Sequence, residues 1–194
     1  MIIVYRKNQL PNMKPLLLLL LVLPFTLCAQ DRYATRTGEV SFFSATPIEN
    51  IQAVNHKAAS VFDAATGAVE FSLLMKGFEF EKSLMQEHFN ENYMESGTWP
   101  KGVFKGKVQG ITSDDLKKPG KHDVTVAGEL TMHGVAQHLD LKGTVDMDAA
   151  GALTAACDFV VKPEDYKITI PGVVRGHIAE EIQVKVRLDL RKMQ

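Results

Sequence analysis

Residues 124–141 alternate apolar and polar side chains in two runs that meet at His133-Gly134. A period of two residues is typical of a β-strand with one face toward an apolar interior and the other toward water. Because glycine accepts the backbone of a tight turn, the two runs predict an antiparallel hairpin. The apolar parity of this hairpin consists of Val124, Val126, Leu130, Met132, Leu139 and Leu141.

The same alternation recurs along most of the chain. Residues 182–190 place an apolar side chain at every second position, and residues 69–75 do the same. Turn-forming residues separate these runs, and the chain has neither a βαβ rhythm nor an internal repeat. The pattern predicts an all-β fold, an antiparallel barrel or sandwich. Eight strands are expected, at residues 38–46, 50–62, 67–77, 102–112, 121–133, 136–148, 151–162 and 180–191.

Residues 81–93 break the alternation, because their apolar side chains follow a helical spacing. We expect one short amphipathic helix there, near one end of the barrel. Tyr93 and Trp99 are expected to pack at that end, and we hypothesise that they belong to a lid over the interior. The irregular residues 163–178 predict a long connection near one barrel mouth.

The N-terminal residues have the composition of a targeting signal. Lys14 precedes an apolar run at residues 16–23, and Ala29 supplies a small residue for cleavage. The apolar run is too short to span a bilayer. We therefore expect residues 1–29 to be a signal peptide cleaved near Ala29, followed by a periplasmic or secreted domain of residues 30–194.

Two details of this region leave alternatives open. Met13 begins a better-formed signal than the residues before it, which favours Met13 as the true start. Acylation of Cys28 is a second interpretation of the cleavage region, although Leu27, the residue before it, is larger than lipidation signals normally have.

Charge and cysteine content exclude some classes of protein. The chain has 22 lysine and arginine residues against 23 aspartate and glutamate residues, without a basic cluster, so no nucleic-acid surface is expected. Signal cleavage would leave Cys157 alone, so no internal disulfide is expected. Its position in an alternating strand favours a buried, inert thiol over a reactive one.

Three short motifs occur in the order found in a known family of exported barrels. They read MQEHFNENY at residues 85–93, WPKGVFKGK at residues 99–107 and GELTMHGV at residues 128–135. Over about residues 38–192 the chain resembles the YceI-like family of lipocalin-like proteins. The resemblance implies an extended eight-stranded antiparallel barrel with an apolar tunnel that holds a long isoprenoid or other lipid chain.

The chain departs from the family pattern in two places. Residues 164–168 read EDYKI where many members carry Arg-x-Asp-Phe-Gly, so head-group contacts from that segment do not carry over. Residues 51–60 do not alternate cleanly where many members have a histidine-bearing strand. Both departures concern the identity of the ligand more than the fold.

The candidate binding surface is the inward parity of the strands. An eight-stranded barrel is just wide enough to be filled by its own side chains or to hold one slim ligand. Alternation alone does not decide between a filled interior and a hollow one. The family resemblance favours a tunnel that takes a long apolar lipid without a cofactor. The expected lining is Phe42, Phe71, Leu73, Met75, Phe104, Val126, Leu130, Leu141, Val145, Phe159, Val184, Val186 and Leu188.

Histidine and acidic residues raise a metal-dependent or hydrolytic enzyme as an alternative. His133 and His138 flank the hairpin turn, and His88 lies beside Glu87 and Glu91 on the expected helix. These residues have neither the HxxxH nor the HExxH spacing of zinc sites, and no Gly-x-Ser-x-Gly elbow occurs. The sequence therefore predicts no catalytic and no metal-binding residues, and His133 is expected to serve the turn.

We predict a non-catalytic lipid-binding protein without a stable membrane span. The principal alternative is a structural or interaction protein whose barrel core is solid, which would show no tunnel. Apolar residues on the outward parity also raise the hypothesis of a homodimer. They are Phe43, Leu74 and Val160.

Overall fold

The computed structural model describes residues 31–193. The predicted signal peptide, residues 1–29, lies outside these residues, as does Cys28.

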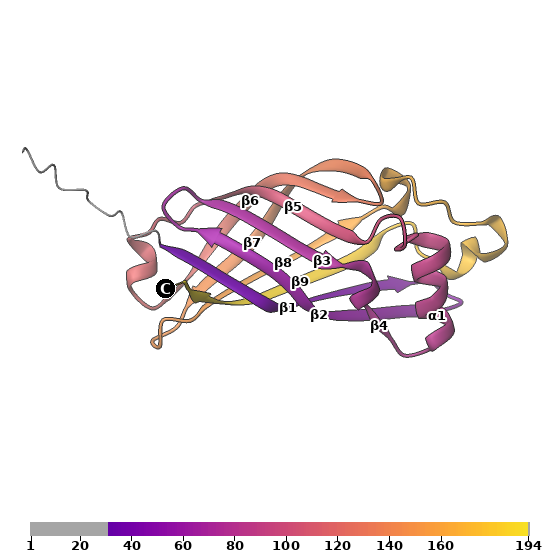
Figure 1. The fold of residues 1–194 in the computed structure, drawn as a ribbon, viewed down its shortest axis with the longest axis horizontal. Helices are drawn as coiled ribbons and strands as arrows, with labels where there is room; N and C mark the ends of the chain where they lie inside the picture. Colours follow the sequence, from indigo (N-terminus) through magenta and orange to yellow (C-terminus); the bar gives the residue numbers. More distant parts are fainter. Residues whose placement is uncertain (1–30, 194) are drawn as a thin grey trace, which may run out of the picture.

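Eight long antiparallel strands close into an elongated barrel (Figure 1). The first strand, β1, pairs with its sequence neighbour β2 and also with the last strand, β9. The pairing of the first strand with the last closes the sheet into a barrel. A two-residue strand, β4 (Glu79–Phe80), adds to β2 at one end. The predicted all-β eight-stranded barrel is thus confirmed. Its strands are β1 (Arg32–Ala45), β2 (Asn50–Asp63), β3 (Ala68–Leu74), β5 (Lys101–Gln109), β6 (Gly120–Met132), β7 (Val135–Met147), β8 (Leu153–Val161) and β9 (Ile182–Lys192).

Three predicted strand limits are wrong by three residues or more, each for a local reason. β1 begins at Arg32 rather than residue 38, because a register shift between Thr35 and Gly38 interrupts the alternation without ending the strand. β3 ends at Leu74 rather than residue 77, because the 3₁₀ turn η1 (Met75–Gly77) bends the chain away from the sheet. β5 ends at Gln109 rather than residue 112, because the chain turns at Gly110, which has a positive φ of 90°.

A second irregularity explains why residues 51–60 lack clean alternation. Val40 faces Asn55 across the β1–β2 ladder, whereas Gly38 faces Ala58, so β2 contains one extra residue at this point. Asn55 is fully buried. Its amide nitrogen donates to the Leu74 carbonyl at 2.9 Å, and its side-chain oxygen accepts from the Lys57 backbone N–H at 2.9 Å. A buried polar residue therefore satisfies one backbone N–H at the bulge and one carbonyl at the end of β3.

The predicted helix is confirmed at one end of the barrel. It consists of α1 (Ser83–His88) followed by the π-helical turn η2 (Phe89–Tyr93). Phe89 stacks on Phe42 of β1 with ring centroids 5.5 Å apart, and it also contacts Phe78 at 5.5 Å and Phe80 at 5.1 Å. This aromatic cluster attaches the helix to the barrel wall.

The opposite end of the barrel is a packed core. Its short 3₁₀ turn η3 (Asp115–Lys117) buries Leu116 beneath the β5–β6 connection. Leu153 and Leu190 are each only 1% exposed there. The buried residues of this closed end are Tyr33, Phe62, Ala64, Val108, Leu116, Val124, Val145, Met147, Leu153, Leu188 and Leu190.

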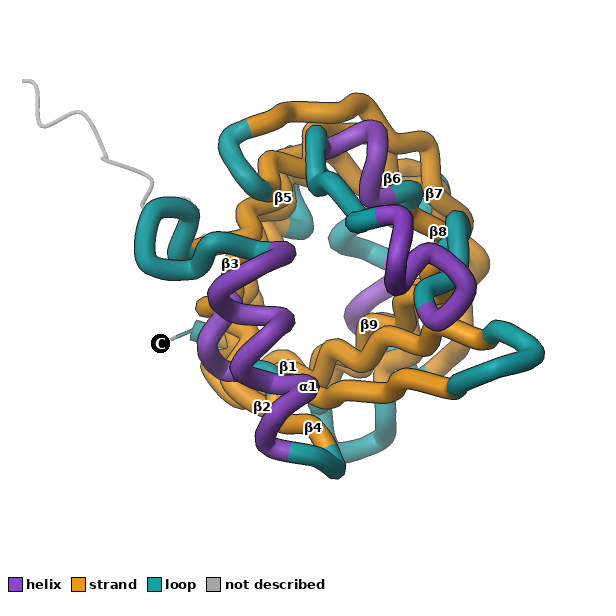
Figure 2. Tube along the Cα trace, turned by 90° about the vertical axis from the view of Figure 1, so that its right-hand side faces the viewer, coloured by secondary structure: helices purple, strands orange, loops and turns teal. Residues whose placement is uncertain are grey.

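The end that carries α1 is the mouth of the barrel. Figure 2 looks onto this end: the α1–η2 segment lies on one side of the barrel axis and the β8–β9 connection on the other. That connection contains η4 (Pro163–Tyr166) and η5 (Gly172–His177), which confirms the predicted irregular segment near a mouth.

Candidate functional site

The barrel interior contains two apolar cavities. The larger, of about 340 Å³, lies beneath the mouth, and the smaller, of about 140 Å³, lies deeper toward the closed end. Both are lined in common by Phe71, Leu130, Phe159 and Val186, so these side chains form a waist between two adjacent chambers. The larger chamber alone has a volume within the range of small-molecule sites, roughly 300–1,000 Å³.

The burial of β9 shows where the barrel is hollow. Val184, Val186, Leu188 and Leu190 all point inward, yet only the last two are buried. An inward side chain that keeps partial exposure must border a void, because the sheet shields it from the outside. The interior is therefore hollow from the mouth to about the level of Val186 and packed beyond Leu188. A barrel with a solid core, the principal alternative from the sequence, would have no such space.

All thirteen side chains expected to line a tunnel border one of the two chambers. Their contact with a ligand stays a prediction. The larger chamber is bordered by Phe42, Leu73, Met75 and Val184, the smaller by Phe104, Val126, Leu141, Val145 and Leu188, and both by the four waist residues.

Sequence reasoning missed the residues that form the mouth. Phe78, Phe80 and Phe89 reach the larger chamber from the β3–α1 segment and the helix, and Ile168 and Ile170 reach it from the β8–β9 connection. The brief alternation of residues 166–170 was the available signal for the second group. Phe89 lies on the apolar face that the helical spacing predicted, whereas Phe78 and Phe80 had no signal because the η1 turn shifts their parity relative to β3.

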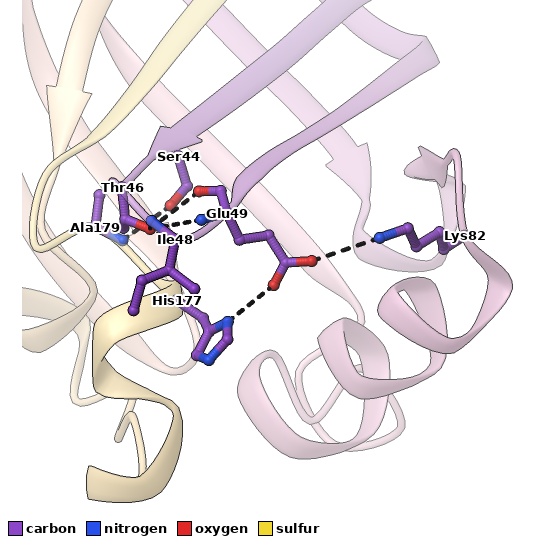
Figure 3. A network of polar contacts seen from close by, with 7 residues as sticks. All are labelled: Ser44, Thr46, Ile48, Glu49, Lys82, His177 and Ala179. Atoms are coloured by element: carbon purple, nitrogen blue, oxygen red, sulfur yellow. Dashed lines mark hydrogen bonds and ion pairs between the residues drawn. The ribbon is translucent and has the colours of Figure 1, made fainter.

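A polar network joins three segments at the rim of the larger chamber (Figure 3). The carboxylate of Glu49, in the β1–β2 turn, lies 3.2 Å from Nδ1 of His177 in η5 and 3.5 Å from Nζ of Lys82, the residue before α1. Glu49 and His177 both border the chamber. The network thus places the principal polar groups of the site where an apolar ligand would expose its polar end.

Local hydrogen bonds fix the position of Glu49. Thr46 Oγ1 accepts from the Glu49 backbone N–H at 3.0 Å and donates to the Glu49 carbonyl at 3.1 Å. The buried Ser44 hydroxyl accepts from the Ala179 backbone N–H at 2.9 Å, which holds the chain beyond His177 against β1. The carboxylate is consequently carried by a hydrogen-bonded turn.

His133 occupies the β6–β7 turn, as expected. His133 and Gly134 both have positive φ, 51° and 72°, which suits the two-residue hairpin turn. The ring of Trp99 covers this turn, so a Cβ at Gly134 would lie 2.6 Å from the indole. Tyr93 borders the larger chamber but Trp99 does not, so only Tyr93 occupies the position expected of a lid residue.

The other histidine candidates do not converge. His138 Nε2 lies 3.5 Å from the Asp140 carboxylate on an exposed stretch of β7. His88 borders the larger chamber, whereas Glu87 and Glu91 do not. Among residues 31–193, no three histidine, cysteine, aspartate or glutamate side chains come together as a metal-ligand group.

Cys157 borders the smaller chamber on β8. Its thiol donates to the Lys142 carbonyl at 3.3 Å. Burial, together with nearby Asp158, raises the pKa of the thiol to about 11, so the group stays protonated at neutral pH. Burial and the adjacent Asp165 similarly raise the pKa of Tyr166 to about 12.

In the part of the chain that the structure describes, no helix has the length and apolarity needed to cross a bilayer.

These features define a class: a closed antiparallel barrel with an apolar, two-chambered interior, a packed end and a polar rim. The chain belongs to the YceI-like domain family, whose family model matches residues 32–190. No curated protein matches the chain.

Three solved structures share the fold. A polyisoprenoid binding domain from Saccharophagus degradans, implicated in plant cell wall breakdown, matches with a TM-score of 0.73 at 13% identity, covering 84% of this chain and 99% of that one. BcnA from Burkholderia cenocepacia matches with a TM-score of 0.66 at 16% identity, covering 80% and 96%. A YCEI protein from Campylobacter jejuni matches with a TM-score of 0.55 at 15% identity, covering 71% and 81%.

Proposed function

We propose that this chain is a non-catalytic lipid-binding protein of the periplasm or the extracellular medium, which holds a long isoprenoid-like chain inside its barrel. The observation that carries the proposal is the pair of adjacent apolar chambers beneath the mouth. The polyisoprenoid named for the Saccharophagus degradans domain supports the choice of ligand class, and the signal-like residues 1–29 support export.

The energetics favour an extended chain. Burying about 500 Å² of apolar ligand surface contributes on the order of 12 kcal/mol before losses, at ~25 cal/mol per Å². Loss of translational, rotational and chain freedom offsets much of this gain and leaves binding at about micromolar dissociation constants or tighter. A flexible chain also fits two chambers joined by a waist better than a rigid polycyclic ligand does.

The chemistry of the lining supports binding without turnover. Cys157 is the cysteine that borders the smaller chamber, and its raised pKa and its bond to the Lys142 carbonyl keep it a protonated thiol. Catalysis by an activated nucleophile requires a neighbouring base, and the residues around Cys157 in the smaller chamber are apolar side chains, glycine and threonine.

The test is extraction of lipid from purified protein. The full chain is expressed in a bacterial host, purified without detergent, extracted with organic solvent and examined by mass spectrometry. We expect one lipid class at near-stoichiometric amount from the native chain and little from a Val184→Trp variant, whose larger chamber would be filled. An empty native protein, after repeated preparations, would contradict the proposal.

A further inference from the structure

The larger chamber has an unusual distribution of charge. Its described lining contains neither lysine nor arginine, and its ionisable members are Glu49, His88, Tyr93 and His177. Burial raises the pKa of Tyr93 further above its ordinary value, so this residue stays neutral. Glu49 is therefore the one carboxylate of a described lining that has no lysine or arginine.

Two cations near the rim, Lys82 and Arg175, are paired with carboxylates. Lys82 lies 3.5 Å from Glu49 and does not border the chamber. Arg175 of η5 lies 2.6 Å from Glu164 and 3.4 Å from Glu180. Lys82 thus offsets part of the Glu49 charge from outside the chamber, and an anionic group inside the chamber has no lysine or arginine of the described lining to pair with.

The hydrogen-bonding pattern of His177 points the same way. With Nδ1 3.2 Å from the Glu49 carboxylate, the neutral ring carries its proton on Nδ1 and donates it to Glu49. The other ring nitrogen is then an acceptor. A hydroxyl group donates to such an acceptor or to the carboxylate itself, whereas a carboxylate or phosphate has only acceptor oxygens to offer.

We propose that the Glu49–His177 pair is a head-group site that selects chains ending in an uncharged hydroxyl over chains ending in a carboxylate or phosphate. This inference rests on the proposed function, because it concerns the polar end of the lipid held in the chambers. The hydrogen-bonded Thr46–Glu49 turn holds the backbone that carries the carboxylate, and the carboxylate itself lies against His177 and Lys82. At a partly buried rim, repulsion between the Glu49 carboxylate and an anionic head group a few ångströms away should weaken binding about tenfold or more relative to a neutral head group.

The experiment compares three ligands with the same hydrocarbon chain. Farnesol carries the hydroxyl, farnesyl phosphate carries the anion and farnesene carries no head group. Their affinities for the purified full chain are measured by displacement of the uncharged fluorophore N-phenyl-1-naphthylamine at about pH 8, above the range in which imidazoles ordinarily take up a proton. We expect farnesol to bind at least about tenfold more tightly than farnesyl phosphate.

Two variants assign this preference to the rim pair. Glu49→Gln removes the charge with little change of shape, so we expect the preference for farnesol to shrink about tenfold, mainly through tighter binding of farnesyl phosphate. His177→Phe should lower the affinity for farnesol to that for farnesene and leave farnesene unchanged. Glu91→Gln, which removes an exposed carboxylate at the same end outside the lining, is the matched control and should leave all three affinities unchanged.

The outcomes separate the two proposals. Equal affinity of the native protein for farnesol and farnesyl phosphate overturns the head-group site and leaves lipid binding intact. A preference that persists in both rim variants, with native circular dichroism, also overturns it. Failure of all three ligands to displace the fluorophore overturns the proposed function and the head-group site together.

Discussion

The imidazole Nδ1 of His133 lies 3.0 Å from the backbone carbonyl oxygen of Tyr166. The β6–β7 turn is thereby joined to η4, the first part of the β8–β9 connection. The ring is largely buried, with 12% of its side chain exposed, and its Nε2 lies 3.9 Å from the Glu95 carboxylate beyond η2. A residue that first suggested chemistry therefore connects three segments around the mouth.

Replacing His133 by alanine should loosen this end of the barrel. The substitution leaves the Tyr166 carbonyl without its partner, and one such hydrogen bond contributes about 1 kcal/mol to the free energy of unfolding. We expect a loss of that size in urea unfolding and faster amide exchange over residues 163–170. His138→Ala removes an exposed imidazole from the same hairpin and should change neither quantity. Equal effects of the two variants would contradict the role assigned to His133.

The turn glycine offers a second test of the mouth. Gly134 and Gly151 both have positive φ, but only Gly134 has the Trp99 ring within contact distance of a new Cβ. Gly151→Ala should cost about 1 kcal/mol through backbone strain alone. Gly134→Ala should cost a further ~1–3 kcal/mol, because the indole must move. Thermal unfolding of both variants measures the difference, and equal losses would show that Trp99 does not constrain the turn.

The two chambers predict that ligand length matters. Val184→Trp fills the larger chamber and should abolish binding of all chains, whereas Leu141→Trp fills the smaller one and should weaken only chains long enough to pass the waist. Native mass spectrometry with a series of isoprenoid alcohols measures this dependence. Val160→Trp, on the outer face of β8, is the control. Unchanged binding in both interior variants would mean that the inward parity is wrong.

Cys157 should react slowly with alkylating reagents. The thiolate is the reactive form, and a pKa of about 11 leaves about one thiolate in a thousand at pH 8. Since the raised pKa favours the protonated thiol, the alkylation rate should rise about tenfold per pH unit from pH 7 toward 10. Peptide mapping after iodoacetamide treatment distinguishes Cys157 from Cys28. A rate at pH 7 equal to that of the urea-unfolded chain would contradict the burial of this thiol.

The barrel was predictable from the sequence because its strands are local patterns. Period-two alternation identified the inward side of β6, β7 and β9, and helical spacing identified residues 83–93 within two residues of the predicted start. The bulge at Asn55 escaped prediction. A loss of alternation says that a strand is irregular, but the hydrogen bond to Leu74 that stabilises the bulge comes from a different strand.

The rim of the site was beyond sequence reasoning for a related reason. Glu49 and His177 are separated by 128 positions and meet only because the barrel closes and brings two connections to one end. Neither residue lies in a motif, and each alone resembles an ordinary surface residue. Inward strand positions repeat and can be extrapolated, whereas a contact between two loops depends on the complete fold.

The packed end of the barrel determines how cargo would be exchanged. Because Leu153 and Leu190 close the far side, the proposed lipid would enter and leave through the same mouth, tail first on loading and head first on release. Donor and acceptor must then visit in turn rather than together. Such a carrier would bind the donor and the acceptor one after the other. The direction of transfer would then follow from the relative affinities of donor and acceptor for the lipid and not from the barrel.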